Sequence, residues 1–230
     1  LDPVDLFNLA VIPADAGVPA AVQESFWGPA SIYCAKRRAF LLIDPPASWV
    51  KKGRPEVVNN TTLITGLRTT VVKQNSAVFF PRLVYNAAGL RRLIGPSGAI
   101  AGLMARIDAT RGVWKAPAGI EADIRGIVDL EINLTDGENG VLNKQAVNCS
   151  RKFPSGFVNW GARTMDGFDD QVSEWKYIPI RRLALFLEES LFRGTKWVGF
   201  EPNDEPLWAK IRLNLNAFMF SLFRQGAFQG

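Results

Sequence analysis

The chain has no histidine among its 230 residues. Without an imidazole it can form neither a Ser-His-Asp triad nor a Cys-His pair, and histidine cannot ligate a metal ion. These devices are the commonest means of hydrolytic and metal-dependent catalysis. We therefore predict a protein that is not an enzyme, with no catalytic, cofactor-binding or metal-ligating residue and no cofactor.

Cysteine is scarce as well. The two that occur, Cys34 and Cys149, lie far apart in the sequence and form no spacing pattern. Such a pair is typical of buried free thiols in a reducing compartment, with a disulfide as the open alternative.

Long apolar runs are also missing from the sequence. No run approaches the roughly 20 residues that a membrane helix needs, so we expect no membrane partner. The chain begins at Leu1 without a methionine, directly in a patterned segment. We therefore expect it to be a piece of a longer protein.

The composition is that of an ordinary globular chain, with 47% hydrophobic and 21% charged residues. A chain of this length can bury one large core or two modest ones. The net charge is +5, and the basic residues are dispersed apart from short pairs such as Arg91 with Arg92 and Arg181 with Arg182. An acidic protein surface explains this balance as well as a nucleic acid does. The positive net charge is the sole feature of the sequence that suggests nucleic-acid binding, and it has this other explanation. We therefore expect no nucleic-acid partner.

The first half of the chain alternates between strand and helix patterns. Three apolar runs are typical of buried parallel strands: residues 4–12, 39–44 and 77–80. Two segments have helical periodicity: residues 19–38 and 97–109. Gly28 and Pro29 are expected to break the first helix, and Gly112 to end the second. Residues 51–74 are compatible with a short helix or an edge strand. This order predicts an α/β class with a doubly wound, mostly parallel sheet.

The second half of the chain predicts a smaller α/β or α+β domain. We place the domain boundary between residues 120 and 150, where the imperfect alternation of residues 124–134 ends, which gives domains 1–140 and 141–230. After a turn signal at residues 154–156, the expected elements are a strand, a helix and a second strand: residues 157–163, 180–193 and 197–200.

The ends of the last two helices have specific signals. Gly194 is expected to stop the first helix in the left-handed conformation that glycine adopts most easily. Asn203 or Asp204 is expected to cap the next helix, with Pro206 in its first turn.

One helix start could bind an anion. Residues 95–98, Gly-Pro-Ser-Gly, open a helix shortly after Arg91 and Arg92, and free helix N–H groups near arginine attract anions. The segment lacks the lysine and the second hydroxyl of a phosphate loop, and it does not match a dinucleotide fingerprint. A plain helix cap is therefore favoured over anion binding.

Carboxylate pairs are a second candidate for chemistry. Glu188 and Glu189 are adjacent in a helix and point about 100° apart, so they do not converge on one substrate atom. Glu189 and Arg193 instead form a favourable i, i+4 ion pair. A further acidic group lacks the twelve-position ligand spacing of a calcium loop, so a polar loop is expected there: Asp166, Asp169 and Asp170.

The last two helices carry apolar residues on two sides. The expected core faces are Ile180, Leu183, Ala184, Leu187 and Leu191 in the first, and Leu207, Ile211, Leu215, Phe218 and Leu222 in the second. Opposite them lie pairs seven residues apart, Leu185 with Phe192 and Leu213 with Phe220. Apolar residues among charges often mark interfaces. Burial of both helices on two sides within the domain is the alternative.

Six short motifs occur in order between Trp160 and Gly226: WGART, RRL, FLEES, RGT, WVGFEPNDEPLW and RQG. Together they resemble the C-terminal part of the contractile tail sheath proteins of bacteriophages. The run PSGAIAGLMARIDATRGVWKAPAG, residues 96–119, resembles a helix and loop of the same family. The segments DLFNLAVIP and RRAFLLIDPP are similar to the opening of its subtilisin-like domain. The resemblance is thinnest over residues 47–75 and 121–143.

This resemblance implies a subtilisin-like domain followed by a sheath C-terminal domain. Such proteins assemble as stacked hexameric rings around a tail tube and contract, which drives the tube through the host envelope with energy stored in the assembly. The implied partners are other sheath subunits and the tail tube, baseplate and tail terminator proteins, in a virion tail assembled in the host cytoplasm. The sheath of a bacterial tailocin or type VI-like injection system is an alternative. An anion-binding or hydrolase-derived module is a more remote one.

The resemblance also implies where the chain meets its partners. In the family the C-terminal helices lie closest to the tube, so we expect Lys210, Arg212 and Arg224 to meet acidic tube residues. With the two apolar pairs they form the candidate tube or subunit interface: Leu185, Phe192, Lys210, Arg212, Leu213, Phe220 and Arg224. The family's chain continues beyond Gly230 into an arm that adds strands to neighbouring subunits. Without that arm, we expect this chain alone to be mainly monomeric.

Overall fold

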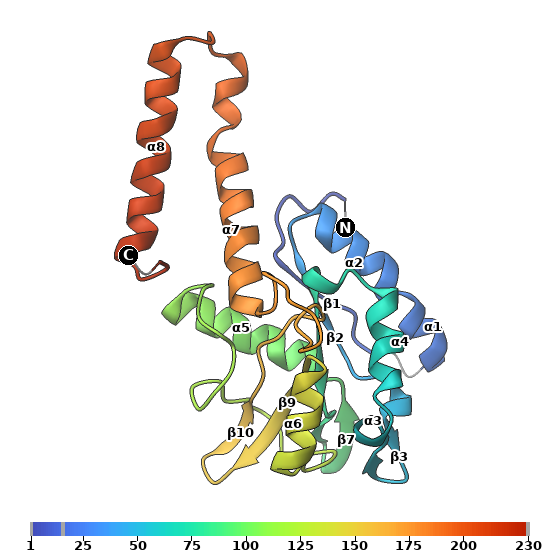
Figure 1. Cartoon of the computed structure of the whole chain (residues 1–230). Coiled ribbons are helices and arrows are strands. Elements are labelled where there is room, and N and C mark those ends of the chain that lie inside the picture. Colours follow the sequence, from blue (N-terminus) through green and yellow to red (C-terminus); the bar gives the residue numbers. More distant parts are fainter. Residues whose placement is uncertain (1, 15–16, 229–230) are drawn as a thin grey trace. The chain divides into compact units, whose positions relative to one another are not determined.

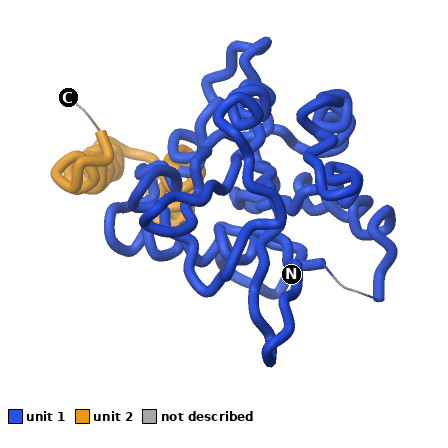
Figure 2. Tube along the Cα trace, turned by 90° about the horizontal axis from the view of Figure 1, so that it is seen from below, with its two compact units in different colours: residues 1–182 blue, residues 183–230 orange. Residues whose placement is uncertain are grey.

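The computed structural model describes residues 2–14 and 17–228. The chain divides into two compact units, Leu1–Arg182 and Leu183–Gly230 (Figure 2). Within the described residues, all strands belong to the first unit, and the second unit is helical.

Five strands of the first unit form one sheet at the centre of a mixed α/β fold (Figure 1). In sheet order they are β1 (Leu9–Val11), β2 (Phe40–Ile43), β5 (Ser76–Phe80), β9 (Val147–Phe153) and β10 (Gly156–Asn159). The first four strands pair in parallel, and β10 runs antiparallel to β9. The predicted α/β class is therefore confirmed, with its mostly parallel sheet.

Helices occupy the connections, because parallel neighbours need a crossover. Between β1 and β2 lie α1 (Ala20–Ser25) and α2 (Trp27–Lys36). Between β2 and β5 lie η1 (Ala47–Trp49), the hairpin of β3 (Val50–Lys51) and β4 (Arg54–Pro55), α3 (Glu56–Asn59), α4 (Thr62–Thr70) and η2 (Lys73–Asn75). Between β5 and β9 lie α5 (Ser97–Arg111) and α6 (Asp136–Lys144).

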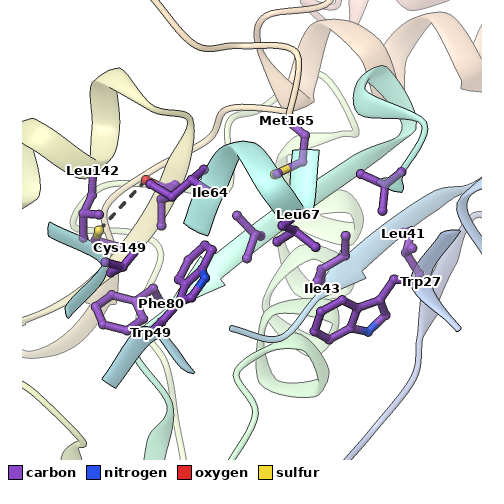
Figure 3. Packing of buried hydrophobic residues seen from close by; sticks show 14 of the residues in the cluster. Trp27, Leu41, Ile43, Trp49, Ile64, Leu67, Phe80, Leu142, Cys149 and Met165 are labelled. Carbon is purple, nitrogen blue, oxygen red and sulfur yellow. Dashed lines mark hydrogen bonds between the residues drawn. The ribbon is translucent and has the colours of Figure 1, made fainter. Parts of the chain in front are cut away.

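The main core lies on one face of the sheet. Successive strand residues point to opposite faces. Leu41 and Ile43 of β2 therefore share one face, and both belong to the large hydrophobic cluster that includes Trp27 of α2 and Ile64 and Leu67 of α4 (Figure 3). This packing fixes α2 and α4 on the same side of β2.

The other face of the sheet is covered by α5. Phe40 and Leu42 are buried but lie outside the large cluster. Helix α5 contacts both β1 and β2 and buries a row of apolar side chains at helical spacing: Ile100, Leu103, Met104 and Ile107. Cover on both faces explains why every position of β2 is apolar.

A second, three-stranded sheet has the order β7-β6-β8 and comprises β6 (Leu83–Ala87), β7 (Leu90–Ile94) and β8 (Asp129–Leu130). Strands β6 and β7 form an antiparallel hairpin. Its two turn residues, Ala88 and Gly89, have φ of 49° and 83°. The sequence did not predict this hairpin, because alanine rarely adopts the left-handed conformation that a tight two-residue turn requires.

Several element boundaries differ from the prediction. Strand β1 is shorter than residues 4–12. The first helical segment breaks at Phe26, before the expected break at Gly28 and Pro29. Pro29 lies in the first turn of α2, where a missing N–H costs no helical hydrogen bond. Residues 51–74 hold both strand and helix, so each of the two alternatives describes part of the segment.

The two compact units do not divide where residues 120–150 predict a domain boundary. Strand β9 pairs in parallel with β5, so Val147 lies beside Val78 and belongs to the first sheet. Of residues 124–134, only Asp129–Leu130 forms a strand. The division between units lies at Arg182 and Leu183 instead.

Both cysteines are free thiols, as predicted, and both are buried in the large cluster. Burial raises the pKa of Cys34 to about 11 and that of Cys149 to about 12. Only the thiolate is nucleophilic, so neither thiol is ready to react near neutral pH.

We expect a disulfide reagent such as 5,5′-dithiobis(2-nitrobenzoic acid) to titrate almost no thiol in the native chain at pH 8 and two thiols in denaturant. The absorbance of the released thiolate measures both values. Rapid modification of either Cys34→Ser or Cys149→Ser in the native state would identify the remaining thiol as accessible and contradict the burial.

Candidate interaction surface

The start of α5, where anion binding was the less favoured alternative to a helix cap, contacts a carboxylate of the chain. Asp44 follows β2, and its Oδ1 accepts a hydrogen bond of 2.8 Å from the Ser97 amide. Burial raises the pKa of the Asp44 carboxyl, and the hydrogen bonds from Ser97 oppose that rise. A Cβ at Gly95 would collide with this carboxylate, so the close approach depends on glycine. The favoured helix-cap interpretation of residues 95–98 is therefore confirmed.

The acidic group after β10 forms a hydrogen-bonded polar loop. The Asp169 carboxylate pairs with Arg163 at 2.6 Å and with Lys176 at 2.8 Å. Hydrogen bonds from Lys176 and Arg163 lower the pKa of Asp169 to about 2. Asp166 accepts hydrogen bonds from the Ser173 hydroxyl and, at 3.2 Å, from the Gln171 amide. The expected polar loop is thus built from ion pairs and hydrogen bonds within the chain.

The WGART motif is held by Asn148, a buried residue of β9. Its Nδ2 donates to the backbone oxygens of Val78 at 3.1 Å and Arg163 at 2.8 Å, and its Oδ1 accepts from the Arg163 amide at 2.7 Å. A Cβ at Gly161 would lie 2.8 Å from Asn148 Cα, so this close approach also requires glycine. One asparagine therefore joins the motif to two central strands.

The first turns of α7 (Ile178–Gly194) are fixed by two buried arginines. Arg182 donates to both carboxylate oxygens of Asp108 on α5, at 2.9 and 2.6 Å. Arg181 donates to Asn75 Oδ1 at 3.2 Å, and its guanidinium carbon lies 4.6 Å from the centre of the Trp175 ring. The sequence did not predict that Arg181 is buried, and these partners make its burial possible.

The same arginines change the face of α7 that is buried. The buried positions are Ile178, Arg181, Arg182 and Leu185, three or four residues apart along one side. Ile180, predicted for the core, is half exposed, and Leu185, predicted for the outer surface, is only 4% exposed. The apolar period of α7 predicted the wrong buried face because it treated Arg181 and Arg182 as solvent-facing positions.

The second unit is a hairpin of two antiparallel helices, the end of α7 and α8 (Glu205–Arg224), joined through η3 (Lys196–Phe200) (Figure 1). The rings of Phe186 and Phe218 lie 6.3 Å apart between the helices. The predicted core stripe of α8 is confirmed as its most buried side: Leu207, Ile211, Leu215, Phe218 and Leu222.

The loop between these helices differs from the prediction in two places. Gly194 is the last helical residue and not a left-handed stop, because helical bonding continues from the Thr195 amide to the Leu191 oxygen at 3.0 Å. Residues 197–200 belong to a 3-10 helix and not to a strand. The cap is as predicted, with Asp204 Oδ1 accepting from the Leu207 amide at 3.0 Å.

One side of α8 forms an exposed band that we call the outer stripe: Lys210, Leu213, Ala217, Phe220 and Arg224. These residues follow each other at alternating spacings of three and four, so they share the face of the helix opposite the core stripe. Leu213 and Phe220 are 69% and 60% exposed. Phe220 and Arg224 also border a shallow hollow with Ala217 and Ser221. Four predicted interface residues therefore lie on one face.

The other candidate residues lie beside this stripe or away from it. Arg212 is exposed on the flank of α8 and forms an ion pair with Glu205. Phe192 of α7 is 51% exposed, and the Lys196 ammonium lies 5.3 Å from its ring centre. The Lys210 ammonium lies 4.6 Å from the Trp197 ring centre. The buried Leu185 does not belong to the exposed set.

Residues 7–165 match the family of the phage tail sheath protein central domain. The chain belongs to this family. One curated relative is the tail sheath protein of Vibrio phage KVP40, which is 29% identical over 133 residues, covering 57% of this chain and 19% of the relative.

Two solved structures match almost the whole chain. A chain of the baseplate of the anti-feeding prophage, 6-fold symmetrised, is 25% identical with a TM-score of 0.77, covering 100% of this chain and 56% of that one. The sheath complex of the extracellular contractile injection system PVC in its contracted state is 27% identical with a TM-score of 0.76, covering 98% and 58%. This sheath chain thus spans a little more than half of these proteins.

Sequence reasoning missed two structural features of this chain. Asn148 stands in a strand that reads VNCSRKF, and the other polar residues of this segment hid the fact that its side chain is buried and hydrogen-bonded. Phe200 is 100% exposed at the hairpin tip, where a strand had been predicted.

Among the described residues, no helix has both the length and the apolar character needed to cross a bilayer.

Proposed function

We propose that the chain is part of a structural sheath subunit that polymerises as stacked hexameric rings around a tail tube and contracts to drive the tube through the host envelope. The observation that carries this proposal is the match of nearly the whole chain to a contracted sheath complex. This part of the subunit would perform no catalysis, since its 230 residues include no histidine and its acidic loop is engaged in internal ion pairs. Contacts between subunits would then supply the energy of contraction.

The fold supports a finer assignment. We propose that residues 1–140 form the core of a subtilisin-like, doubly wound domain and that residues 141–230 begin the sheath C-terminal domain. The parallel order β1-β2-β5, with helices contacting both faces, supports the first part, and β9 of the second part extends that sheet. The helical hairpin with its capped α8 supports the second.

The proposed partners are copies of the subunit and the tail tube, baseplate and tail terminator proteins, in a virion tail assembled in the host cytoplasm. Relatives come from a phage and from contractile injection systems. Capsid or terminase genes beside the coding gene would identify a phage, and their absence from a contractile gene cluster would identify an injection system. Sedimentation tests the expectation that this chain alone is mainly monomeric, and polymers in ordinary buffer would contradict it.

We propose that the outer stripe of α8 faces the tail tube, with Arg212 on its flank. Lys210 and Arg224 stand at its two ends, and the exposed Leu213 and Phe220 lie between them. A partner with acidic residues around apolar contacts complements this arrangement. Phe192 is proposed as a neighbouring subunit or tube contact.

The double substitution Lys210→Glu and Arg212→Glu in the full-length subunit tests this surface. It should weaken tube-templated assembly about tenfold or more at low salt, because two attractive charges become repulsive. The defect should become smaller at high salt, where screening shortens the range of charge interactions. Sedimentation of subunits with purified tubes and electron microscopy measure the yield.

A matched control makes the same charge change elsewhere. Lys51→Glu and Arg54→Glu reverse two exposed charges on the hairpin of β3 and β4. Normal assembly of this control together with defective assembly of the test variant supports the proposed surface. Equal assembly of both variants with tubes would contradict the proposed tube-facing surface.

A further inference from the structure

Strand β7 is an open edge of the three-stranded sheet. The sheet order is β7-β6-β8, so β7 has one neighbour and β6 has two. All five residues of β7, Leu90–Ile94, are exposed. Edge strands present unpaired backbone groups that can pair with another chain.

The register shows which backbone groups face this open edge. The oxygens of Arg82, just before β6, and of Val84 in β6 accept hydrogen bonds from the amides of Glu131 and Val128, so both residues face the β8 side. Backbone groups alternate in direction along a strand. The intervening residues of β6 therefore face β7, where their partners are Leu90, Arg92 and Ile94.

It follows that Arg91 and Leu93 direct their N–H and C=O groups away from β6. These groups are separated by one residue, which is the spacing at which a neighbouring strand forms its ladder. The edge thus offers two donors and two acceptors to an added strand.

The side chains of β7 combine apolar surface with positive charge. Arg91 and Leu93 share one face of the strand, and Leu90, Arg92 and Ile94 share the other. Leu90 is 61% and Leu93 49% exposed. Within residues 2–14 and 17–228, neither Arg91 nor Arg92 has a carboxylate within ion-pair distance. Each face of the edge therefore carries an uncompensated arginine next to an exposed leucine or isoleucine.

We propose that the β7 edge binds an extended segment of a partner polypeptide in which carboxylates alternate with apolar residues, as a fourth strand of the sheet. Backbone pairing with Arg91 and Leu93 would supply the ladder, and the arginine on the face that carries the carboxylates would select an acidic segment. The same charges repel a second β7, which disfavours pairing of two identical edges. This binding is independent of the outer stripe of α8.

The first test uses two fluorescent ten-residue peptides and the full 230-residue chain. One peptide alternates glutamate with valine, and the other alternates lysine with valine. Anisotropy at low salt should show the acidic peptide binding about tenfold more tightly or better, since the arginine on the face that carries the glutamates gains a carboxylate in place of an ammonium. An acidic peptide with methylated backbone nitrogens should not bind, because it cannot donate to the ladder.

Two variants separate charge from backbone pairing. Arg91→Glu with Arg92→Glu should reverse the preference, so that the lysine peptide binds more tightly. Leu93→Pro removes only an outward N–H and should abolish binding of the acidic peptide while thermal denaturation stays near that of the unchanged chain, as proline is tolerated at strand edges. Leu93→Ala is its control and should retain binding within about threefold.

Hydrogen exchange locates the bound peptide. The amides of Arg91 and Leu93 should become protected in the complex, while that of Arg92, already paired with β6, should not change. Failure of both peptides to bind, or protection confined to other elements, would overturn the proposal and leave the arginines as a guard against non-specific pairing.

Discussion

Replacing Asn148 with alanine is expected to lower the free energy of unfolding of the first unit by about 3 kcal/mol. Asn148 is fully buried, and its side chain makes three hydrogen bonds, two of them to the backbone of Arg163. Alanine leaves these backbone groups without partners, and each buried unpaired group costs about 1–3 kcal/mol. Urea denaturation followed by tryptophan fluorescence measures the loss.

Asn148→Asp distinguishes hydrogen bonding from simple packing. The carboxylate has nearly the volume of the amide and can accept from the Arg163 amide, but it cannot donate to the oxygens of Val78 and Arg163. We expect a loss at least as large as that of the alanine variant, because the carboxylate is also desolvated. Asn86→Ala, on the exposed hairpin, is the control and should change stability by no more than about 0.5 kcal/mol. A stable Asn148→Asp protein would show that the amide protons contribute little.

Asp108→Ala should lower the free energy of unfolding by about 3 kcal/mol, which is the second large expected effect. Asp108 is the bidentate partner of Arg182, whose side chain is only 4% exposed, while that of Asp108 is 25% exposed. Removing one member of a buried ion pair leaves a desolvated charge, which costs about 3–5 kcal/mol, and the partial exposure of Asp108 places the effect at the lower end. Thermal denaturation of the chain measures the change.

Helix α5 also provides a control for this prediction. Arg111, on the same helix, pairs with Glu121 at 2.7 Å, and both side chains are more than half exposed. Glu121→Ala should therefore cost at most about 1 kcal/mol, as for other surface ion pairs. Similar losses in Asp108→Ala and Glu121→Ala would mean that burial of Arg182 does not strengthen its pair.

Parts of the fold that depend on continuous apolar runs were predictable. Strands β2 and β5 lie within one or two residues of the predicted segments, because buried parallel strands need apolar residues on both faces. The hairpin of β6 and β7 was not predicted, since its turn uses Ala88 in a conformation that the residue type does not favour. The conformational preference of a single residue does not predict a turn whose geometry is set by the pairing of the two strands.

The candidate surface was predictable to a similar extent. The period of α8 separated its core stripe from Leu213 and Phe220 correctly, because no charged residue of that helix is buried. On α7 the same reasoning failed for Leu185. A periodic pattern locates a buried face only when the polar residues on that face have no hidden partner.

The sequence alone determined the α/β class, the lack of histidine chemistry, the free thiols, the capped last helix and the likeness to sheath proteins, since these depend on residue type and local spacing. Only the tertiary structure decided that Arg181 and Arg182 are buried, that Asn148 holds the WGART motif and that β7 is an open edge. Each of these depends on a partner, or a missing neighbour, that is distant in the chain. The energy of burying a polar group is set by what lies next to it in space.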